Sequence, residues 1–393
     1  RGEERRSTGA ALDACWKQGL MARPVVLTFV GYYLPGYKAG GPIQSIANLV
    51  AHLGDEFDFR IVTRDRDAGD NEPYPGIDAA QWRTVRKAQV YYRSPPTRTL
   101  NAIARLIDET PHDLVYLNSF FDPSSSILPL LARKLGLVSR RPVILAPRGE
   151  FSSGALGLKS IKKKAFMAAA RTIRLHRDLL WHASSEHEAA DIQAVFGSAA
   201  SIHIASDLPR AVSEGAIHMP RTAGQALRVL FLSRVSPMKN LTFALDVLDR
   251  VAAPVVLSII GPINNETAYW AECQARIAKL PSHITVTYDG VVPAMEVPAA
   301  MAKNDLFFLP TLGENFGHVI IEALGAGTPA LISDQTPWRD LDRAGCGWVE
   351  PLGDPQVFAD HIDALFCERP DVVAARRAAA LDYARRFAAD NGV

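Results

Sequence analysis

The chain has few cysteines and no long apolar run. Its 393 residues include only four cysteines, scattered without a Cys-x-x-Cys pair: Cys15, Cys273, Cys346 and Cys367. This spacing excludes a disulfide framework and a cysteine-based zinc site, and it is typical of reduced thiols in a cytoplasmic protein. No apolar run approaches the roughly 18 to 20 residues that a membrane-spanning helix needs. Residues 1–21 also lack the apolar core of a signal peptide.

An excess of charge of one sign is also absent. Lys and Arg number 43 and Asp and Glu number 42, which leaves a net charge of +1 at pH 7. No global field therefore favours a nucleic acid as partner. The sequence has no repeat of fixed period, which excludes a solenoid. With 48% hydrophobic and 22% charged residues, the composition is that of a globular protein long enough for two full cores.

Composition divides the chain into five segments. Residues 1–21 are polar and end at Met21. We expect either that they form a disordered tail or that translation of the protein starts at Met21. Residues 22–205 and 227–380 form two domains with the same pattern of short apolar runs. Between them, residues 206–226 contain proline and glycine and are interpreted as a linker. Residues 381–393 form a tail that is expected to begin a helix.

Short apolar runs alternate with helical patterns in both domains. The runs occupy 25–30, 59–63, 89–92, 113–118, 142–146 and 179–183 in the first half, and 227–232, 255–260, 284–288, 305–310, 329–332 and 348–349 in the second. Buried strands that alternate with amphipathic helices predict parallel sheets covered on both faces. The predicted fold class is α/β, with two Rossmann-like domains that bind ligands at the carboxyl ends of their strands.

Residues 313–322 read Gly-Glu-Asn-Phe-Gly-His-Val-Ile-Ile-Glu and join the run at 305–310 to a predicted helix. The free N–H groups and the dipole of a helix start favour an anion. A carboxylate does not bind phosphate but accepts hydrogen bonds from hydroxyls. A site in which backbone amides bind a phosphate, and Glu314 and Glu322 accept hydrogen bonds from hydroxyls, suits a sugar nucleotide.

Cations and glycines follow the first predicted strand of each domain. Arg234 and Lys239 lie in the loop after 227–232, where two cations can converge on one diphosphate. The alternative is ordinary solvated loop charge. Gly40 and Gly41 follow 25–30, where a glycine loop lets the backbone approach a phosphate or sugar. A plain flexible turn is the alternative there.

These residues together resemble the family 4 glycosyltransferases, which have the two-domain GT-B fold and retain anomeric configuration. The resemblance rests on Glu314 and Glu322 separated by seven residues, with Phe316 and Gly317 between them, and on Arg234 with a lysine five positions on. In the first half, residues 40–42, 146–150 and 182–186 resemble a bacterial polysaccharide-assembly branch. The match covers roughly residues 22–380.

The resemblance implies a role for each site residue. Arg234 and Lys239 would bind the donor diphosphate and stabilise the leaving nucleotide, and Glu314 would hold hydroxyls of the donor sugar. Glu322 would hold the ribose. The other donor-binding residues would be Gly40, Gly41, Gly261, Val292, Asn315, Phe316, Gly317 and His318. Candidates on the acceptor side are Asn118, Arg148, Glu150 and Ser185.

The resemblance also implies the partners. The co-substrate would be a nucleotide-diphosphate sugar, and the acceptor a lipid-linked saccharide in surface polysaccharide or lipopolysaccharide assembly. No cofactor and no essential metal are expected. Asp65-Arg66-Asp67 imitates a metal-binding Asp-x-Asp motif but is predicted to be a solvated loop. A basic helix from Lys159 to Arg177 suggests peripheral contact with an anionic membrane on its cytoplasmic face, or else a solvated surface.

Other functions are less consistent with the sequence. A nucleotide-sugar epimerase on the same fold and a catalytically inactive glycan-binding relative stay open. No G-x-G-x-x-G follows a strand, which argues against a dinucleotide oxidoreductase. Two departures from the family pattern matter: Asp207 stands where asparagine is more usual, and the first-domain cleft lacks the histidine that many members have. The donor base, the sugar and the linkage are not determined.

Overall fold

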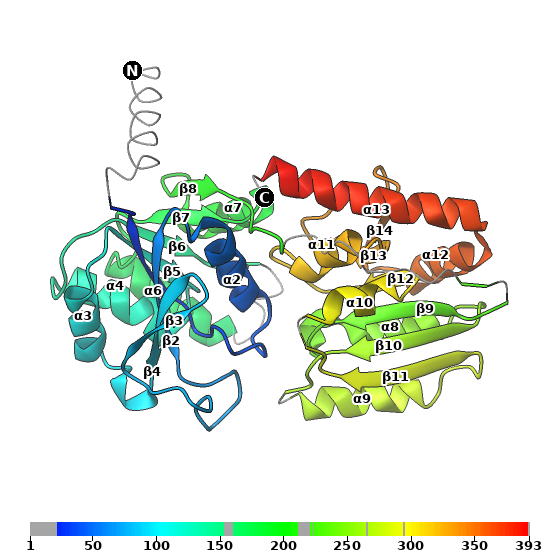
Figure 1. Ribbon diagram of the computed structural model, residues 1–393, viewed down its shortest axis with the longest axis horizontal. Coiled ribbons are helices and arrows are strands. Elements are labelled where there is room, and N and C mark those ends of the chain that lie inside the picture. The colour runs from blue at the N-terminus through cyan, green and yellow to red at the C-terminus, as the bar shows by residue number, and fades with distance from the viewer. Residues whose placement is uncertain are drawn as a thin grey trace, which may run out of the picture.

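The computed structural model describes residues 22–152, 160–210, 221–222, 224–264, 266–293 and 295–391. These residues form two α/β domains that lie side by side (Figure 1). The predicted leader 1–21, Lys159 and linker residues 211–220 lie outside the described residues. None of the described helices combines the length and the hydropathy that crossing a membrane requires.

The N-terminal domain contains an eight-stranded sheet in the order β3-β4-β2-β1-β5-β6-β7-β8. All neighbouring strands pair in parallel except β3 and β4. Every apolar run predicted in this half is a strand, which confirms the fold class, whereas β3 and β8 were not predicted. The strands are β1 (Val25–Phe29), β2 (Asp58–Arg64), β3 (Trp82–Val85), β4 (Ala88–Arg93), β5 (Leu114–Asn118), β6 (Val143–Ala146), β7 (Leu180–Ala183) and β8 (Ser201–Ile204).

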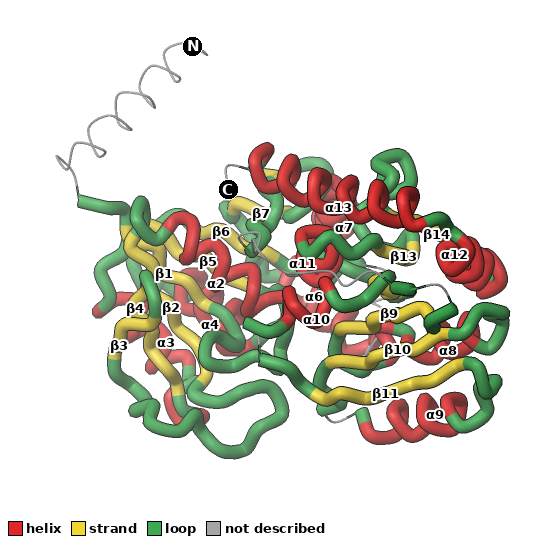
Figure 2. The backbone as a smooth tube through the Cα atoms, turned by 45° about the vertical axis from the view of Figure 1, so that its right-hand side comes forward, coloured by secondary structure: helices red, strands yellow, loops and turns green. Residues whose placement is uncertain are grey.

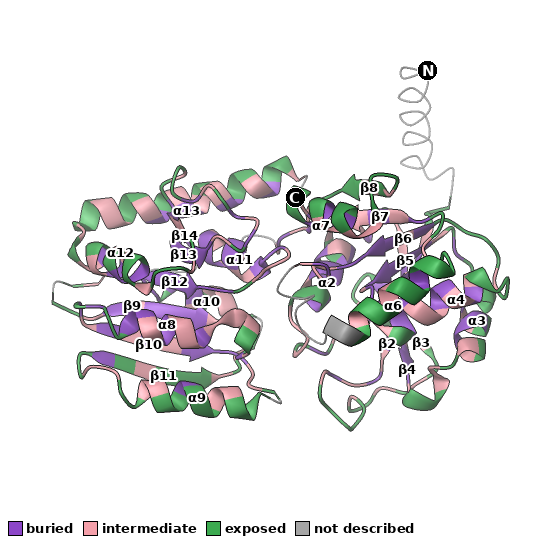
Figure 3. Ribbon diagram, turned by 180° about the vertical axis from the view of Figure 1, so that it is seen from behind, coloured by how far each residue is buried: buried purple, intermediate pink, exposed green. Residues whose placement is uncertain are grey.

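Helices cover both faces of this sheet because its strands bury side chains on both sides. In β1, Val26 belongs to a core cluster that includes residues of helix α2, whereas Leu27 and Phe29 belong to a second cluster that includes residues of α3, α4, α6 and α7. Figure 3 shows the buried strands between these helices, whose outer surfaces are exposed. The helices are α2 (Gly41–Leu53), α3 (Leu100–Glu109), α4 (Leu128–Lys134), α6 (Ser160–Thr172) and α7 (Glu186–Phe196), with short turns η1 (Pro95–Thr97) and η2 (Pro123–Ile127).

The C-terminal domain contains a parallel six-stranded sheet in the order β11-β10-β9-β12-β13-β14. Each of these strands was predicted. They are β9 (Leu227–Leu232), β10 (Val255–Ile260), β11 (Ile284–Gly290), β12 (Leu306–Leu309), β13 (Ala330–Ser333) and β14 (Gly347–Glu350). The helices are α8 (Leu241–Leu248), α9 (Thr267–Ile277), α10 (Val297–Ala302), α11 (His318–Gly325), α12 (Pro355–Cys367) and α13 (Pro370–Asp390), with the short turn η3 (Pro237–Lys239).

Helix α13 is one continuous helix across the predicted boundary at residue 380. Its Phe387 ring packs 5.8 Å from the ring centre of Phe316 and 4.9 Å from that of Trp338, which fixes α13 beside the turn before α11. Figures 1 and 2 both place the carboxyl end of α13 close to the N-terminal domain, near α7. The helix therefore supports the turn before α11 from behind and reaches toward the opposite domain.

Candidate active site

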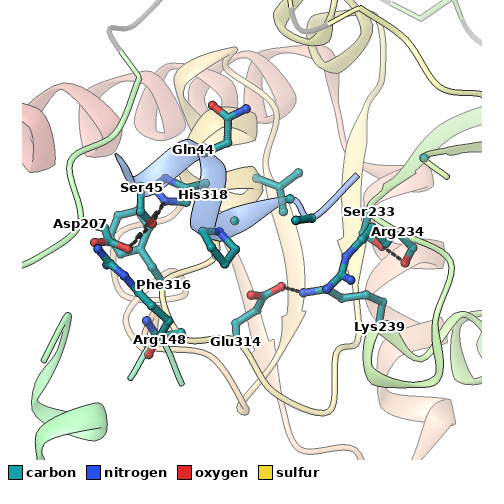
Figure 4. A pocket seen from close by; sticks show the side chains of 18 of the residues that line it. Gln44, Ser45, Arg148, Asp207, Ser233, Arg234, Lys239, Glu314, Phe316 and His318 are labelled. Atoms are coloured by element: carbon teal, nitrogen blue, oxygen red, sulfur yellow. Dashed lines mark hydrogen bonds and ion pairs between the residues drawn. The ribbon is translucent and has the colours of Figure 1, made fainter. Parts of the chain in front are cut away.

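A cavity of about 880 Å³ lies between the two domains. It is lined by the loops that follow β1, β6 and β7 in one domain and β9, β10, β11 and β12 in the other. The cavity therefore lies at the carboxyl ends of both parallel sheets, where ligands of such sheets bind. Figure 4 shows side chains from both walls pointing toward this space.

The two predicted cations, Lys239 and Arg234, lie on the C-terminal wall and differ in whether a described residue pairs with them. The Lys239 ammonium forms an ion pair with Glu314. The Arg234 guanidinium is exposed and has no hydrogen-bond or ion-pair partner among the described residues. Gly40 lies opposite: a Cβ built there would lie 3.7 Å from Arg234 Nε, and its φ of +71° favours glycine. The glycine loop of the first domain therefore lies directly against Arg234.

Glu322 projects from α11 into the same cavity. Its Oε1 atom is buried and has no hydrogen-bond partner within the described part of the chain. The nearest cation is Arg210, whose Nε lies 4.0 Å from that oxygen. Burial raises the pKa of Glu322, and Arg210 opposes this shift. A buried oxygen that accepts no hydrogen bond is ready to accept one from a ligand hydroxyl.

The turn before α11 is held rigidly. Gly317 has a φ of +79°, and a Cβ there would lie 2.9 Å from Ile320 Cδ1, so glycine is required. The Glu314 amide donates to Gln335 O over 2.9 Å, and Trp338 Nε1 donates to Phe316 O over 2.5 Å. Asn315, Phe316, Gly317 and His318 all line the cavity. The first N–H groups of α11, which have no partner inside the helix, lie at this wall.

Gly261 and Val292 line the cavity at the ends of β10 and β11. A Cβ on Gly261 would lie 2.0 Å from Ser233 O, so the chain passes Ser233 too closely for any side chain. The Gly261 amide donates to Gly290 O over 2.7 Å, which draws the two loops together. All the predicted donor-side residues thus line one cavity.

A buried network at the wall of the cavity links the two domains. Ser45 of α2 donates to Asp207 over 2.6 Å, and its Oγ lies 2.9 Å from His318 Nε2 on α11. Because the Ser45 proton goes to Asp207, the His318 ring is the donor in the second contact. Burial alone would raise the pKa of Asp207, but the paired Arg148 guanidinium, with His318 and Ser45, holds it below its usual range.

Arg148 is the centre of this network. It donates to Asn118 Oδ1 over 3.1 and 2.9 Å and to the Tyr116 hydroxyl over 2.8 Å. The Tyr116 hydroxyl lies 2.6 Å from His182 Nδ1, whose other ring nitrogen lies 2.8 Å from Ala205 O. Asn118 is not among the described residues that line the cavity, so it positions Arg148 from behind.

The other two acceptor-side candidates also bond to the protein. Glu150 lines the cavity and accepts from Ser119 Oγ over 2.7 Å and from the amides of Phe120 and Phe121 over 2.5 and 3.0 Å. Burial raises the pKa of Glu150, and these hydrogen bonds oppose it. Ser185 accepts from the Glu188 amide over 3.2 Å as the N-cap of α7, and it lies outside the described lining.

Several lining residues were not predicted. Ser45 and Arg210 line the cavity, and Asp207 was noted only as a departure from the family pattern; Gly149, which lies in the 146–150 segment that resembles the family, lines the cavity as well. A Cβ on Gly149 would lie 2.8 Å from Asn315 Cβ, so this glycine lets the two domains meet. No local signal marks Ser45 or Arg210, because their role depends on how α2 and the linker approach α11.

The prediction of a solvated loop at Asp65-Arg66-Asp67 is wrong for both carboxylates. Asp65 and Asp67 are buried. Asp65 pairs with Arg66 and Arg98, and Asp67 accepts from the amides of Tyr37 and Lys38. These aspartates order the loop that leads to Gly40. No group of side chains in the described ranges has the composition and spacing of a metal site.

Two family models match the chain in order. Residues 40–206 match the glycosyl transferase 4-like domain, and residues 220–385 match the glycosyl transferases group 1. The chain belongs to the family 4 glycosyltransferases. The resemblance drawn from Glu314, Glu322, Arg234 and Lys239 is thereby confirmed.

Individual relatives agree with this family. The chain is 35% identical to a phosphatidyl-myo-inositol mannosyltransferase of Mycobacterium leprae over 40% of this chain and 42% of that protein. It is 27% identical to a D-inositol 3-phosphate glycosyltransferase of Thermobispora bispora over 59% of this chain and 55% of that protein. The chain thus spans about half the length of the curated relatives that it matches.

The fold is shared more widely than the sequence. The crystal structure of Anabaena Alr3699/HepE in complex with UDP and glucose superposes with a TM-score of 0.67 at 18% identity, covering 93% of this chain and 95% of that one. The predicted GT-B fold is confirmed.

Proposed function

We propose that this glycosyltransferase transfers a sugar from a nucleotide-diphosphate sugar to a glycan acceptor with retention of anomeric configuration. The observation that carries the proposal is one interdomain cavity in which Arg234, Lys239, Glu314 and Glu322 meet the amino end of α11. Cations and helix amides suit a diphosphate, and carboxylates suit hydroxyls. A sugar nucleotide carries both kinds of group.

Arg234 and Lys239 would hold the diphosphate and stabilise the charge that develops on the departing nucleotide. Electrostatic stabilisation of this kind is usually the largest contribution to such a reaction. Arg234 has no partner to give up among the described residues, so it is ready for the donor. The glycine loop at Gly40 lies against it and would close the diphosphate from the opposite side.

Lys239 would change partners when the donor binds. It pairs with Glu314 in the structure, and a diphosphate would draw the ammonium away from that carboxylate. Glu314 would then accept hydrogen bonds from the donor sugar's hydroxyls, while Glu322 would accept from the ribose. The donor phosphate can take the acceptor's proton, so neither glutamate acts as an acid or base. The two cations supply the counter-charge without an essential metal.

The acceptor would approach along the N-terminal wall, past Glu150 and α7. Lipid-linked acceptors are consistent with the phosphatidylinositol substrate in a relative's name. Helix α6 and the residues after it expose Lys162, Lys164, Arg171, Arg174 and Arg177. This basic face would attract anionic headgroups on the cytoplasmic side of a membrane. The acceptor is then expected to be a saccharide in surface polysaccharide or lipopolysaccharide assembly.

A thermal-shift panel of UDP, GDP, ADP and their sugars tests the proposal. A nucleotide present at a hundred times its dissociation constant should stabilise the chain by about 2.7 kcal/mol. We expect one base to be preferred and the shift to survive chelation of divalent metals. The proposal fails if no nucleotide stabilises the chain.

A further inference from the structure

Arg93, at the carboxyl end of β4, is a buried guanidinium with unused donors. It is 1% exposed, and its NH1 group donates to Ser124 O over 3.1 Å. Its Nε and NH2 atoms are buried and have no hydrogen-bond partner among the described residues. It forms no ion pair with any described carboxylate. Burial lowers the pKa of Arg93 to about 10; the Asp122 carboxylate opposes this shift, and Arg98 and Arg64 add to it.

Arg377 in the other domain provides a contrast. It is also buried, at 7% exposure, and burial lowers its pKa to about 10. Its two terminal nitrogens donate to Asn304 O over 2.9 Å and to Ala302 O over 3.1 Å, at the end of α10. Arg377 therefore has a structural role that accounts for its burial. The Arg93 guanidinium lies over the Phe29 ring, 5.8 Å from the ring centre, but two of its three nitrogens have no hydrogen-bond partner among the described residues.

Two more arginines lie beside Arg93. Arg64 pairs with Asp122 and donates to the Tyr32 hydroxyl. Arg98 donates to Arg93 O over 3.5 Å and lies 3.6 Å from Asp65 Oδ1. The Nε atoms of Arg64 and Arg98 are also buried and have no partner in the described chain. Three guanidinium groups thus lie beside two carboxylates; Arg64 pairs with Asp122, Arg98 and Arg66 both pair with Asp65, and Arg93 pairs with neither among the described residues.

A buried hydroxyl adds a further unused donor beside Ser124, whose carbonyl accepts from Arg93. The Oγ atom of Ser125 has no partner among the described atoms. Water can satisfy single N–H and O–H groups, but it does not balance the charge of a buried guanidinium. Buried hydrogen-bond donors without acceptors, together with an excess of positive charge at the same place, are features of an anion-binding site.

This arginine cluster (Arg64, Arg93 and Arg98) lies near the acceptor side of the cavity. Arg64 and Arg93 end β2 and β4, so they occupy the same edge of the sheet as the cavity. The Asp122 amide donates to Ser119 Oγ over 3.1 Å, and Ser119 donates to the cavity-lining Glu150 over 2.7 Å. One loop therefore connects the cluster to the cavity. The side chains of Arg64 and Arg98 are 20% and 23% exposed, so the cluster is accessible from solvent.

We propose that the arginine cluster binds the phosphate of a phosphate-bearing acceptor. Guanidinium groups match phosphate with paired hydrogen bonds, and three of them at a sheet edge provide both the charge and the donors. Arg93 forms the floor of the site, and Arg64 and Arg98 close over the anion. The assignment to the acceptor rests on the proposed glycosyl transfer, whereas phosphate binding itself does not.

Inorganic phosphate tests the site in the full-length chain. The background is a double variant that carries Arg234→Gln and Lys239→Gln, so that phosphate does not bind at the donor site. Phosphate should stabilise this protein in thermal unfolding, and adding Arg98→Gln should weaken the apparent affinity at least tenfold. Arg98 is chosen because it is partly exposed, and Arg105→Gln, on the exposed side of α3, is the matched control. The proposal that the cluster binds phosphate would be overturned if the phosphate affinity were the same with and without Arg98→Gln.

Acceptor kinetics distinguish an acceptor phosphate from free phosphate. In the chain with an intact donor site, Arg98→Gln should raise the acceptor KM at least tenfold for a saccharide on a lipid diphosphate. The KM of the same saccharide on a neutral aglycone, and the KM of the donor, should not change. Lost phosphate binding with an unchanged KM for the lipid diphosphate would overturn the assignment to the acceptor. Absence of any transfer by the unmutated chain would instead count against the proposed function.

Discussion

On the C-terminal wall of the cleft, Arg234 and Glu322 have polar atoms that form no hydrogen bond with any described residue. On the N-terminal wall, by contrast, Arg148 and Glu188 form hydrogen bonds with other protein groups. Arg148 meets Asp207, Asn118 and Tyr116. Glu188 accepts from the Gly149 amide over 2.6 Å and from Ser184 N and Oγ over 2.8 and 2.9 Å. The protein thus holds Arg148 and Glu188 in place, whereas Arg234 and Glu322 leave polar atoms available to a ligand.

This difference separates two tasks. The N-terminal network fixes the position of the 148–150 loop and joins it to the linker and to α11. The C-terminal wall presents a free cation, an exchangeable ion pair and an unbonded carboxylate oxygen to a ligand. Substitutions in the first set should therefore change stability, and substitutions in the second should change donor binding and turnover.

Arg148→Met should have the largest effect, and that effect should be on stability. It leaves Asp207 buried without its main counter-charge, which typically costs about 3–5 kcal/mol. Urea unfolding measures the loss. Nucleotide affinity of the folded fraction should change less than threefold; a stable variant that no longer binds nucleotide would reverse the division of tasks.

Arg234→Gln should reduce turnover without reducing stability. Losing one group that stabilises developing charge typically costs about 2.7–4 kcal/mol, or a factor of 10² to 10³ in kcat. Because Arg234 is exposed and contacts no described partner, the free energy of unfolding should stay within about 0.5 kcal/mol. Steady-state kinetics measure the change, with the exposed Arg250→Gln as the matched control. Equal kcat in the two variants would contradict the assignment.

Glu322→Ala and Glu314→Ala should differ in what they weaken. A hydrogen bond to a charged group contributes about 1.5–3 kcal/mol, so Glu322→Ala should weaken nucleotide binding by roughly 10- to 100-fold. Glu314→Ala should spare nucleotide affinity and lower turnover. Titration calorimetry with the nucleotide diphosphate compares them, and equal losses of affinity would refute separate sites for ribose and sugar.

The smallest predicted effect is a loss of stability at acidic pH, and it arises from His176 in the N-terminal domain. His176 stacks on Phe120 with ring centres 4.6 Å apart, and burial lowers its pKa to about 4. Below the unfolded pKa of about 6.5, the unfolded chain binds a proton that the folded chain does not, so stability falls as pH falls toward 4. Between pH 7 and pH 5.5 this loss is about 1 kcal/mol.

His176→Phe keeps the ring packing and removes this protonation. The variant should lose about 1 kcal/mol less stability than the unmutated chain over the same pH range, as measured by urea unfolding at both pH values. An identical pH dependence in the two proteins would show that His176 titrates normally.

Local sequence predicted most of the fold and the donor wall. Long buried strands carry their own apolar signal, and the residues of 313–322 stay adjacent in space because one turn holds them. The edge strands β3 and β8 were missed because they are short and largely exposed. Ser45 and Arg210 were missed because their contacts join segments that are far apart in the chain. Burial of Asp65 and Asp67 depends on such contacts as well.

The location of the donor is tested most directly by amide shifts in the NMR spectrum of the full-length chain. The titrant is the nucleotide diphosphate that gives the largest thermal shift. We expect the perturbed amides to cluster at Gly40 and Gly41, at Arg234 and Gly261, and from Asn315 to Val319. Perturbations confined to the N-terminal wall, with the amides around α11 unchanged, would contradict the claim that the C-terminal wall holds the donor.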